Sequence, residues 1–442
     1  MDGIGLGAVD TLLARREREG RPIRVGLVGV GAVGRAIARQ LAGPVPGLRL
    51  SALAGRTLEG VSRAATGAGL GAFTRIRTQG ECDAVVARGG VAVTEAAELV
   101  CGCTALDVIV EASADVEFGA RVACDAIARA KAVVLVNAEL DATVGSALKA
   151  RADVAGAVIT GTDGDEPGVA MNLVRLVRSL GLRAVGAGNL KGFLDRRRTP
   201  ETQAPFAAAN AVSPWLATAA ADGTKLAVEA TILANATGFG VGRRGMYGPR
   251  CAHVRDAAGA FPMEQLLGGG LVDYVLGAEP HVGAFVLVYE PDPAKQQWLR
   301  YLKLGDGPMY VLHTPYHLPH LQVVNTIARA ALLEDATITP LGAPVCEVVT
   351  IAKRDLSAGE LLDGIGGFLA YGTIENARQA SQDALLPIGV SKGCRLTRDV
   401  SADEPVTRAD VELPPGRLVD RLRAEQGAAA SELAGADAGA TR

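Results

Sequence analysis

The chain has 442 residues, which is too long for one ordinary hydrophobic core, so two or three domains are expected. Hydrophobic residues make up 49% and charged residues 21% of the sequence, which excludes a largely disordered chain. The net charge of −3 gives no electrostatic basis for binding nucleic acid or a membrane surface. No apolar run reaches membrane-spanning length, and the N-terminal residues lack the apolar core of a signal peptide. We therefore expect a cytoplasmic protein whose seven scattered cysteines stay reduced.

A glycine-rich turn near the N-terminus is the most informative motif. Residues 23–28 form a short apolar run that is typical of a buried strand, and residues 35–41 continue with helical spacing. Between them, Gly29 makes a turn, Gly31 lets a pyrophosphate approach the backbone, and Gly34 lets the helix pack closely on the strand. Glycine-rich turns without a ligand are common, but this one has the required strand and helix on its two sides. We expect the cofactor to contact Gly29, Gly31, Ala32, Val33 and Gly34.

The residues after the second predicted strand indicate which dinucleotide binds. NAD-binding turns are typically followed, about 20 residues later, by an acidic residue that binds the ribose 2′-hydroxyl. Here the strand at 48–54 is followed by Gly55, Arg56 and Thr57, and no carboxylate appears before Glu59. An arginine and a hydroxyl suit a 2′-phosphate, so the pattern favours NADP over NAD. The alternative is that Arg56 is simply an exposed loop residue.

The remainder of the first domain alternates strands with helices. Strands are predicted at 106–112, 132–136 and 157–160, helices at 117–131 and 140–150, and a polar connector at 80–90. With right-handed crossovers, this alternation predicts a doubly wound parallel sheet of the Rossmann type. Because the carboxyl ends of such strands line the cofactor crevice, we expect cofactor contacts from Ala112, Ser113 and Asn137. Glu139 then lies nearest the nicotinamide and is a candidate acid or base.

Beyond this domain the pattern changes to a mixed α+β type. A helix is predicted at 170–180, a strand at 183–190, a long helix at 217–236, and several strands within 249–304. A strand followed by a helix at 310–333 is expected to return to the first domain. We divide the chain into a dinucleotide-binding domain (1–165), an α+β substrate and dimerisation domain (166–310), a return segment that packs on the first domain (311–340), a small β-rich domain (341–422) and a disordered tail (423–442).

Several motifs carry a family resemblance. The turn at 29–34, the polar loop at 161–168, Asn189–Asp195 and Asp222–Ala234 resemble, in order and spacing, the homoserine dehydrogenase superfamily. Residues 345–413 resemble a SAF module. The combination is similar to the reductoisomerase-like proteins of branched isoprenoid precursor synthesis and to sugar-acid oxidoisomerases, and Pro315–Leu318 fits that subgroup. The resemblance implies a homodimer, or a higher homo-oligomer, formed through the second domain.

The sequence departs from true homoserine dehydrogenases at two places. Those enzymes carry a lysine directly after the strand-end asparagine, whereas Asn137 is followed here by an alanine and Glu139. Their asparagine-glycine-threonine sequence after the substrate strand is replaced by Leu194-Asp195-Arg196. We therefore expect a substrate other than homoserine.

Hydride transfer needs a proton donor or acceptor beside the reacting oxygen, and lysines are the first candidates. Lys225 matches a lysine of the family's helix, although a surface lysine on an amphipathic helix is the alternative. Lys191 ends a strand, where its ammonium could polarise a carbonyl, or it could be an ordinary turn residue. Asp195 and Asp222 could orient these amines or act as turn and cap residues.

Other polar side chains are candidates for binding the substrate or a metal. Asp163 and Glu166 in the loop at 161–168 are expected to bind substrate, and Arg196 could hold a phosphate or carboxylate through forked hydrogen bonds, or simply be solvated. Three histidines, His313, His317 and His320, fall close together, so a divalent metal site is conceivable. Two prolines, at 315 and 319, argue against a regular helix there, so no metal site is predicted. Pro315 and His317 are expected instead to contact the cofactor or substrate.

These observations predict an enzyme that acts on a small molecule. The leading hypothesis is an NADP-dependent oxidoreductase, with or without coupled isomerisation, acting on CH–OH groups of a small polyhydroxylated acid or sugar phosphate. The first alternative is a homoserine dehydrogenase-type dehydrogenase of an amino or hydroxy acid. The second is a non-catalytic NADP-binding sensor or assembly protein. The clustering of Glu139, Lys191, Asp195 and Lys225 at strand ends and turns favours an enzyme.

Overall fold

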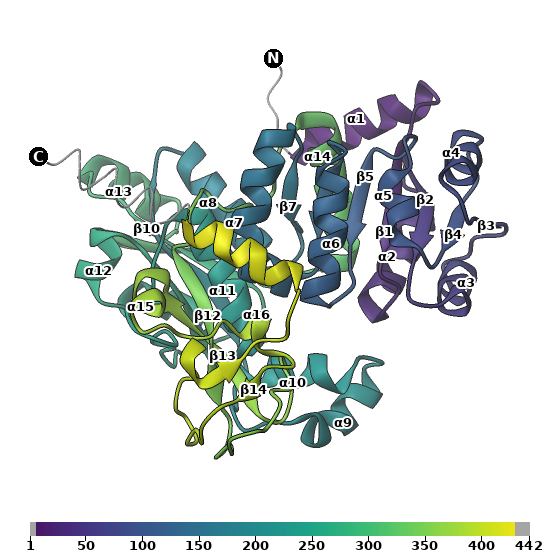
Figure 1. Cartoon of the computed structure of the whole chain (residues 1–442). Coiled ribbons are helices and arrows are strands. Elements are labelled where there is room, and N and C mark those ends of the chain that lie inside the picture. The colour runs from purple at the N-terminus through teal and green to yellow at the C-terminus, as the bar shows by residue number, and fades with distance from the viewer. Residues whose placement is uncertain (1–5, 429–442) are drawn as a thin grey trace, which may run out of the picture. The chain divides into compact units, whose positions relative to one another are not determined.

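The chain folds into two compact units. The computed structural model describes residues 6–428 (Figure 1). Of these residues, unit 1 comprises 6–164 and 318–339, and unit 2 comprises 165–317 and 340–428. The predicted tail at 423–442 is helical as far as residue 428, and its remainder lies outside the described residues. No helix in the described part of the chain is both long and apolar enough to cross a membrane.

Unit 1 is built on a seven-stranded parallel sheet with the strand order β3-β4-β2-β1-β5-β6-β7. The strands are β1 (Ile23–Val28), β2 (Leu48–Ala54), β3 (Thr74–Arg75), β4 (Ala92–Thr94), β5 (Val108–Glu111), β6 (Ala132–Leu135) and β7 (Ile159–Gly161). Along the chain, β2, β3 and β4 are added on one side of β1, and β5, β6 and β7 are then added on its other side. This reversal places a ligand crevice at the carboxyl ends of β1 and β5. The predicted doubly wound α/β fold is confirmed.

Helices cover both faces of this sheet. The helices are α1 (Leu6–Arg18), α2 (Ala32–Ala42), α3 (Leu58–Gly67), α4 (Gln79–Ala87), α5 (Ala97–Gly102), α6 (Val116–Ile127), α7 (Ala138–Ala155) and α14 (Pro319–Leu333). Helices α1, α2, α3 and α14 pack as one layer, and α4, α5, α6 and α7 pack as another. Helix α14 returns to this unit late in the chain and buries Val323 and Ile327 in its core. The prediction of a connector at 80–90 is wrong, because most of this segment belongs to α4, which begins at a capping box formed by Thr78 and Glu81.

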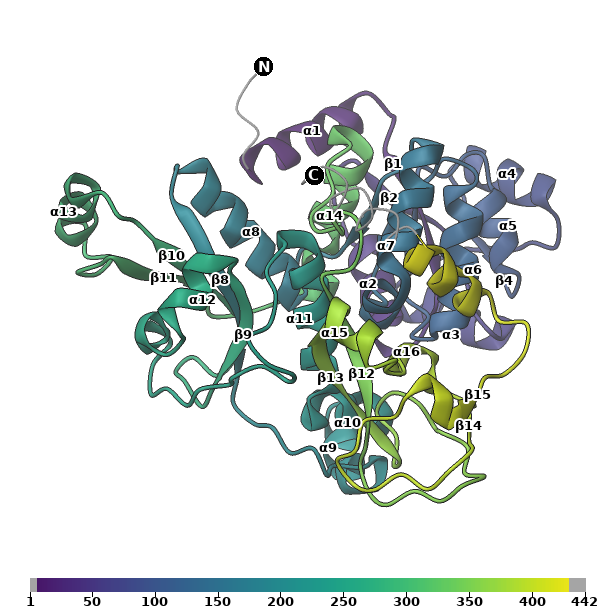
Figure 2. The same cartoon turned by 60° about the vertical axis from the view of Figure 1, so that its left-hand side comes forward.

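Unit 2 contains a four-stranded mixed sheet with the order β11-β10-β8-β9. Its strands are β8 (Arg183–Lys191), β9 (Leu271–Leu276), β10 (Ala284–Tyr289) and β11 (Met309–Thr314). Strand β8 runs parallel to β9 and antiparallel to β10. Helices α8 (Glu166–Ser179) and α11 (Thr224–Thr237) pack on this sheet, and Figure 2 shows α13 (Pro293–Tyr301) at the end of the β10–β11 hairpin.

Two sequence expectations for unit 2 need correction. The long helix expected at 217–236 is two helices, α10 (Pro214–Asp222) and α11, because Gly223 between them has a φ of +91°. The segment 249–304 was expected to hold several strands. It holds only β9 and β10, together with η1 (Val254–Gly259), α12 (Met263–Gly268) and α13. Helix α9 (Pro200–Ala209) precedes α10.

The C-terminal part of unit 2 is rich in short strands. It contains β12 (Cys346–Ala352), β13 (Ala370–Asn376), α15 (Ala377–Gln382), α16 (Ile388–Ser391), β14 (Arg395–Leu396), η2 (Arg408–Asp410) and β15 (Val411–Glu412). Strand β12 pairs with β13 and β14 with β15, both antiparallel. The buried ammonium of Lys353 bonds to Asp222 Oδ2 at 2.8 Å and donates to the carbonyls of Arg198 and Gly367. This buried cation fixes the C-terminal part to the end of α10.

Candidate active site

The glycine turn of unit 1 has the geometry of a dinucleotide site. Gly29 has a φ of +104°, and a Cβ there would overlap the carbonyl of Ala112 at the end of β5. A Cβ at Gly34 would overlap the Gly29 carbonyl, so both glycines are required by close packing. A Cβ at Gly31 would meet nothing within 4 Å, and Gly31 begins α2 without a side-chain cap. The first N–H groups of α2 therefore remain available for a diphosphate.

The other predicted cofactor residues lie at the carboxyl ends of their strands. Arg56 is exposed after β2, and the neighbouring Thr57 caps α3 by accepting a hydrogen bond from Gly60 N. Ser113 follows β5 together with Ala112. Asn137 is buried after β6, where it accepts from Leu140 N and donates to Asp115 O, so its amide also shapes the start of α7. Glu139 lies half-buried in the first turn of α7.

A carboxyl group that the sequence analysis did not single out ends β5. Glu111 is fully buried, and burial raises its pKa to about 7 even though Ser113 N donates a 2.8 Å hydrogen bond to it. A carboxylate at the end of an otherwise apolar strand was the available signal. Unit 1 thus carries an acid that titrates near neutrality at the carboxyl end of its sheet.

Unit 2 brings four predicted or newly found charged residues together. Lys191 ends β8, Glu166 begins α8, and Lys225 and Glu229 lie one turn apart on α11. Lys191 Nζ lies 3.2 Å from Glu166 Oε1 and 3.6 Å from Glu229 Oε2. Lys225 Nζ lies 2.8 Å from Glu229 Oε1. Two ammonium groups therefore share one fully buried carboxylate.

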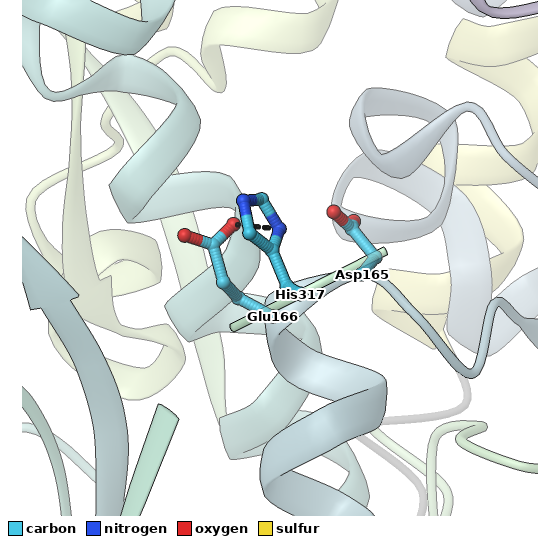
Figure 3. A group of neighbouring side chains, drawn as sticks. All are labelled: Asp165, Glu166 and His317. Atoms are coloured by element: carbon cyan, nitrogen blue, oxygen red, sulfur yellow. Dashed lines mark ion pairs between the residues drawn. The ribbon is translucent and has the colours of Figure 1, made fainter. Parts of the chain in front are cut away.

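Three further side chains complete this cluster. His317 Nδ1 lies 3.3 Å from Glu166 Oε2, as Figure 3 shows, and Lys225 Nζ lies 3.7 Å from Asp165 Oδ1. The buried Asn189 donates a 2.7 Å hydrogen bond to Glu229 Oε2. We call these seven residues the lysine–glutamate cluster: Asp165, Glu166, Asn189, Lys191, Lys225, Glu229 and His317. The structure places every one of them in unit 2.

The charges of the cluster set its protonation states. Burial opposes ionisation of Glu229, but Lys191 and Lys225 outweigh it and hold the pKa of Glu229 well below its usual range. Burial and the nearby charge of Glu229 raise the pKa of Glu166 to about 8. Burial opposes the charge on Lys191, yet Glu229 and Glu166 raise its pKa above the usual value. Burial lowers the pKa of His317.

These states give the cluster a defined chemical capacity at neutral pH. Glu166 is a carboxylic acid with a proton to give, and it lies beside a neutral imidazole. Lys191 is a fixed positive charge that can stabilise a developing alkoxide. Such a set combines an acid, a proton carrier and an electrostatic stabiliser, which is what carbonyl–alcohol interconversion needs.

Asp165, Glu166 and His317 also offer ligand atoms for a metal ion, all within 4.8 Å of one another. Lys225 and Lys191 already lie against the first two of these residues, at 3.7 and 3.2 Å. A divalent cation would therefore have to compete with two ammonium groups for the same two carboxylates. His313, which lies on β11, makes an edge-on ring contact with His253.

Several predicted site residues lie outside the cluster. Asp222 forms the buried pair with Lys353, and Asp195 pairs with Arg198 at 3.0 Å in a turn. Asp163 belongs to unit 1, where Arg329 lies 3.7 Å from its Oδ2. Pro315 is exposed two residues before His317. Arg196 lies over the ring of Tyr371, with 5.4 Å between the guanidinium carbon and the ring centroid.

The sequence analysis missed three members of the cluster. Glu229 could have been found as the only acid within the apolar helix that begins at Thr224, four residues after Lys225. Asp165 stands beside the predicted Glu166. Asn189 lies within a strand and gives no signal until Glu229 is placed opposite it.

Comparisons with known proteins bear on this segment. Residues 164–323, just over a third of the chain, match the family described as oxidoreductase DRL, catalytic domain. This range contains the whole lysine–glutamate cluster. No curated protein is similar enough in sequence to count as a match.

Solved structures show weaker similarity. An NAD-binding oxidoreductase from Klebsiella pneumoniae is 19% identical with a TM-score of 0.29, and the alignment covers 39% of this chain and 43% of that one. Myo-inositol dehydrogenase from Lactobacillus casei is 11% identical with a TM-score of 0.39, and the alignment covers 73% of this chain and 89% of that one. Biliverdin reductase from Synechocystis sp. PCC 6803 is 13% identical with a TM-score of 0.37, and the alignment covers 71% of this chain and 91% of that one. Similarity at this level leaves the functional argument to the residues themselves.

The family match and the glycine turn agree on the class of enzyme. The chain is an NAD(P)-dependent oxidoreductase. The expectation of an enzyme with a nicotinamide cofactor is confirmed at this level, and the non-catalytic alternative falls away.

Proposed function

We propose that the chain is an NADP-dependent oxidoreductase that interconverts a CH–OH group and a carbonyl in a small polyhydroxylated acid or sugar phosphate. The lysine–glutamate cluster is the observation that carries this proposal, because it lies in the matched catalytic segment and combines a protonated acid with two ammonium groups. The glycine turn of unit 1 binds the cofactor, whose nicotinamide supplies or accepts the hydride when bound.

The chain's own residues handle the proton and the charge. In the direction of reduction, Lys191 donates a hydrogen bond to the carbonyl oxygen and stabilises the negative charge that develops there. His317 gives the proton on Nε2 to this oxygen, and Glu166 passes its own proton to His317 Nδ1 across the 3.3 Å contact. Glu166 becomes a carboxylate, which Lys191 neutralises at 3.2 Å. Oxidation reverses these steps.

The preference for NADP rests on the segment after β2. Arg56 is exposed there beside Thr57, and no acidic residue stands between the end of β2 and Glu59. A charge-assisted bond from a guanidinium is worth about 1.5–3 kcal/mol, so NADPH should bind roughly tenfold to a hundredfold tighter than NADH.

A nicotinamide fluorescence titration tests this preference. Arg56→Ala should weaken NADPH binding to the level of NADH and leave NADH binding unchanged, while the exposed control Arg77→Ala should change neither. Equal binding of NADPH and NADH to the wild type would refute the preference for NADP.

A coupled isomerisation is a second candidate function. Skeletal rearrangement of a hydroxy ketone needs an acid and a base at one site, and the contact between protonated Glu166 and neutral His317 supplies both. Product analysis distinguishes the two reactions. Simple oxidation leaves the carbon skeleton of the substrate unchanged, whereas the coupled reaction alters it.

A further inference from the structure

Arg250 lies on the same face of the unit 2 sheet as the lysine–glutamate cluster. Lys191 pairs in parallel register with Leu276 of β9, and Leu276 pairs in parallel with Arg250 on the far side of that strand. Residues paired in this way point to the same face, and neighbouring strands lie about 4.8 Å apart. Arg250 therefore points to the face that carries Lys191, with about 10 Å between their Cα atoms.

The segment that carries Arg250 is held firmly against β9. Buried Asp273 accepts 2.8 Å hydrogen bonds from the backbone N–H groups of Tyr247, Gly248 and Tyr274. A Cβ at Gly248 would overlap the hydroxyl group of Tyr274. The hydroxyl of Tyr274 therefore lies directly against this segment.

A second arginine reaches the same segment from another loop. Gly245 has a φ of +80°, and a Cβ there would lie 3.4 Å from Arg196 Nη2. Arg196 also stacks on Tyr371, and Arg243 stacks on Tyr247 with its guanidinium carbon 5.1 Å from the ring centroid. Aromatic stacking fixes the plane of each guanidinium. Arg243 donates from Nε to Met246 O at 2.9 Å and from Nη2 to Tyr247 O at 3.2 Å, which holds it further and leaves Nη1 as the nitrogen that it can offer to a ligand.

Three arginines lie near enough to Tyr274 for their charges to act on its hydroxyl. Burial raises the pKa of Tyr274 and Asp273 adds to the effect, whereas Arg196, Arg243 and Arg250 all act to lower it. Among residues 6–428, no carboxylate forms an ion pair with any of these three arginines. Asp273, the buried acid nearby, already accepts three backbone hydrogen bonds.

Neighbouring arginines behave differently. Arg197 pairs with Asp403 at 2.5 Å, and Arg244 pairs with Glu375 and Asp383 at 2.8 and 2.9 Å. Within residues 6–428, the protein thus pairs two arginines of this region with carboxylates and leaves three that form no ion pair. Three such guanidinium groups around one hydroxyl have the donor chemistry that binds an oxyanion.

We propose that Arg196, Arg243 and Arg250, with the hydroxyl of Tyr274, form an oxyanion site for the non-reacting end of the substrate, either a phosphate monoester or a carboxylate. The role as a substrate end rests on the proposed function, which places the reacting carbonyl at Lys191. The site selects substrates that carry an anionic group at a distance from the reacting carbon. Compounds without that group bind weakly.

Titration calorimetry with inorganic phosphate, and separately with acetate, tests the site. Wild type should bind at least one of these anions, Arg250→Ala should bind it at least tenfold more weakly, and Arg250→Lys should fall between them. Arg178→Ala, an exposed arginine at the end of α8, is the matched control and should bind like wild type. If Arg250→Ala loses binding of phosphate but not of acetate, the natural group is a phosphate monoester. If it loses binding of acetate but not of phosphate, the natural group is a carboxylate.

Anion binding at the glycine turn of unit 1 is common to all these variants, so the difference between wild type and Arg250→Ala isolates the proposed site. Equal anion binding by all variants, or none by the wild type, overturns the proposal. NADPH binding is measured on the same samples and should be equal in wild type and Arg250→Ala. A wild type that fails to bind NADPH contradicts the proposed function. The difference in anion binding between wild type and Arg250→Ala is a separate result and tests only the oxyanion site.

Discussion

Glu229→Gln removes the negative charge that the two lysines share and changes little else in volume. Lys191 Nζ contacts Glu166 Oε1 at 3.2 Å and Glu229 Oε2 at 3.6 Å, so these two oxygens lie at most 6.8 Å apart. Two charges at that distance interact by about 2.4 kcal/mol at an effective dielectric constant of about 20. Removing the charge should therefore lower the pKa of Glu166 from about 8 by roughly 1.8. Burial, the larger cause, remains and keeps the pKa above its ordinary value.

Infrared difference titration measures this change without a substrate. The carbonyl stretch of a protonated carboxylic acid that disappears on raising the pH is assigned to Glu166 by its absence in Glu166→Gln. Its midpoint should fall by roughly 1.8 in Glu229→Gln. The midpoint should stay unchanged in Glu201→Gln, an exposed glutamate of α9. An unchanged midpoint in Glu229→Gln would refute the coupling between the two carboxyl groups.

Three further predictions concern the cofactor turn, the buried ion pair and pH. Gly31→Ala should keep the wild-type melting temperature but bind NADPH more weakly. Gly29→Ala should lower both the melting temperature and the affinity for NADPH, because of the two added Cβ atoms only the one at Gly29 would meet protein atoms. Thermal melts and fluorescence titrations that show equal effects of the two substitutions would contradict this. Lys353→Met should lower the free energy of unfolding by about 3–5 kcal/mol in urea denaturation, because it leaves the Asp222 carboxylate buried without a positive charge beside it. A change below about 1 kcal/mol would mean that Asp222 is not charged in the folded state. Glu166 keeps in the folded state a proton that the unfolded chain releases near its usual pKa of 4.5, so the stability it contributes is full below that pH and declines as the pH rises towards about 8. Urea denaturation over this range should show a flatter decline in Glu166→Gln.

The sequence predicted unit 1 well because its signals are local. The apolar strand, the three glycines and the helix that follows them lie within twenty residues of one another, and each acts through its neighbours in the chain. The wrong predictions of helix bounds involve glycines, because a glycine can lie either within a helix or at its end. Gly80 was expected in a connector but lies inside α4, whereas Gly223 was expected inside a helix and divides α10 from α11. A glycine's φ is set by tertiary contacts that the sequence does not state.

The candidate site was predicted only in part, for a physical reason. Lys191, Lys225, Glu166 and His317 were expected from strand ends and motifs, and the structure brings all four together. Their protonation states depend on Glu229, which is buried within α11. The sequence pattern shows only that Glu229 lies in an apolar helix and does not show which charged groups it meets. Asp222 was placed beside these amines by its position in a motif, but its partner Lys353 lies 131 residues later in the chain. Pairings over such distances are fixed by folding and are not visible in spacing.

The most direct test of the central claim is the rate of NADPH formation when wild type and Lys191→Met are mixed with NADP and a panel of small hydroxy acids and sugar phosphates. We expect wild type to reduce NADP with at least one compound, and Lys191→Met to do so about a hundredfold or more slowly while binding NADPH equally well. A Lys191→Met variant that forms NADPH at the wild-type rate would contradict the assignment of the lysine–glutamate cluster as the site of chemistry.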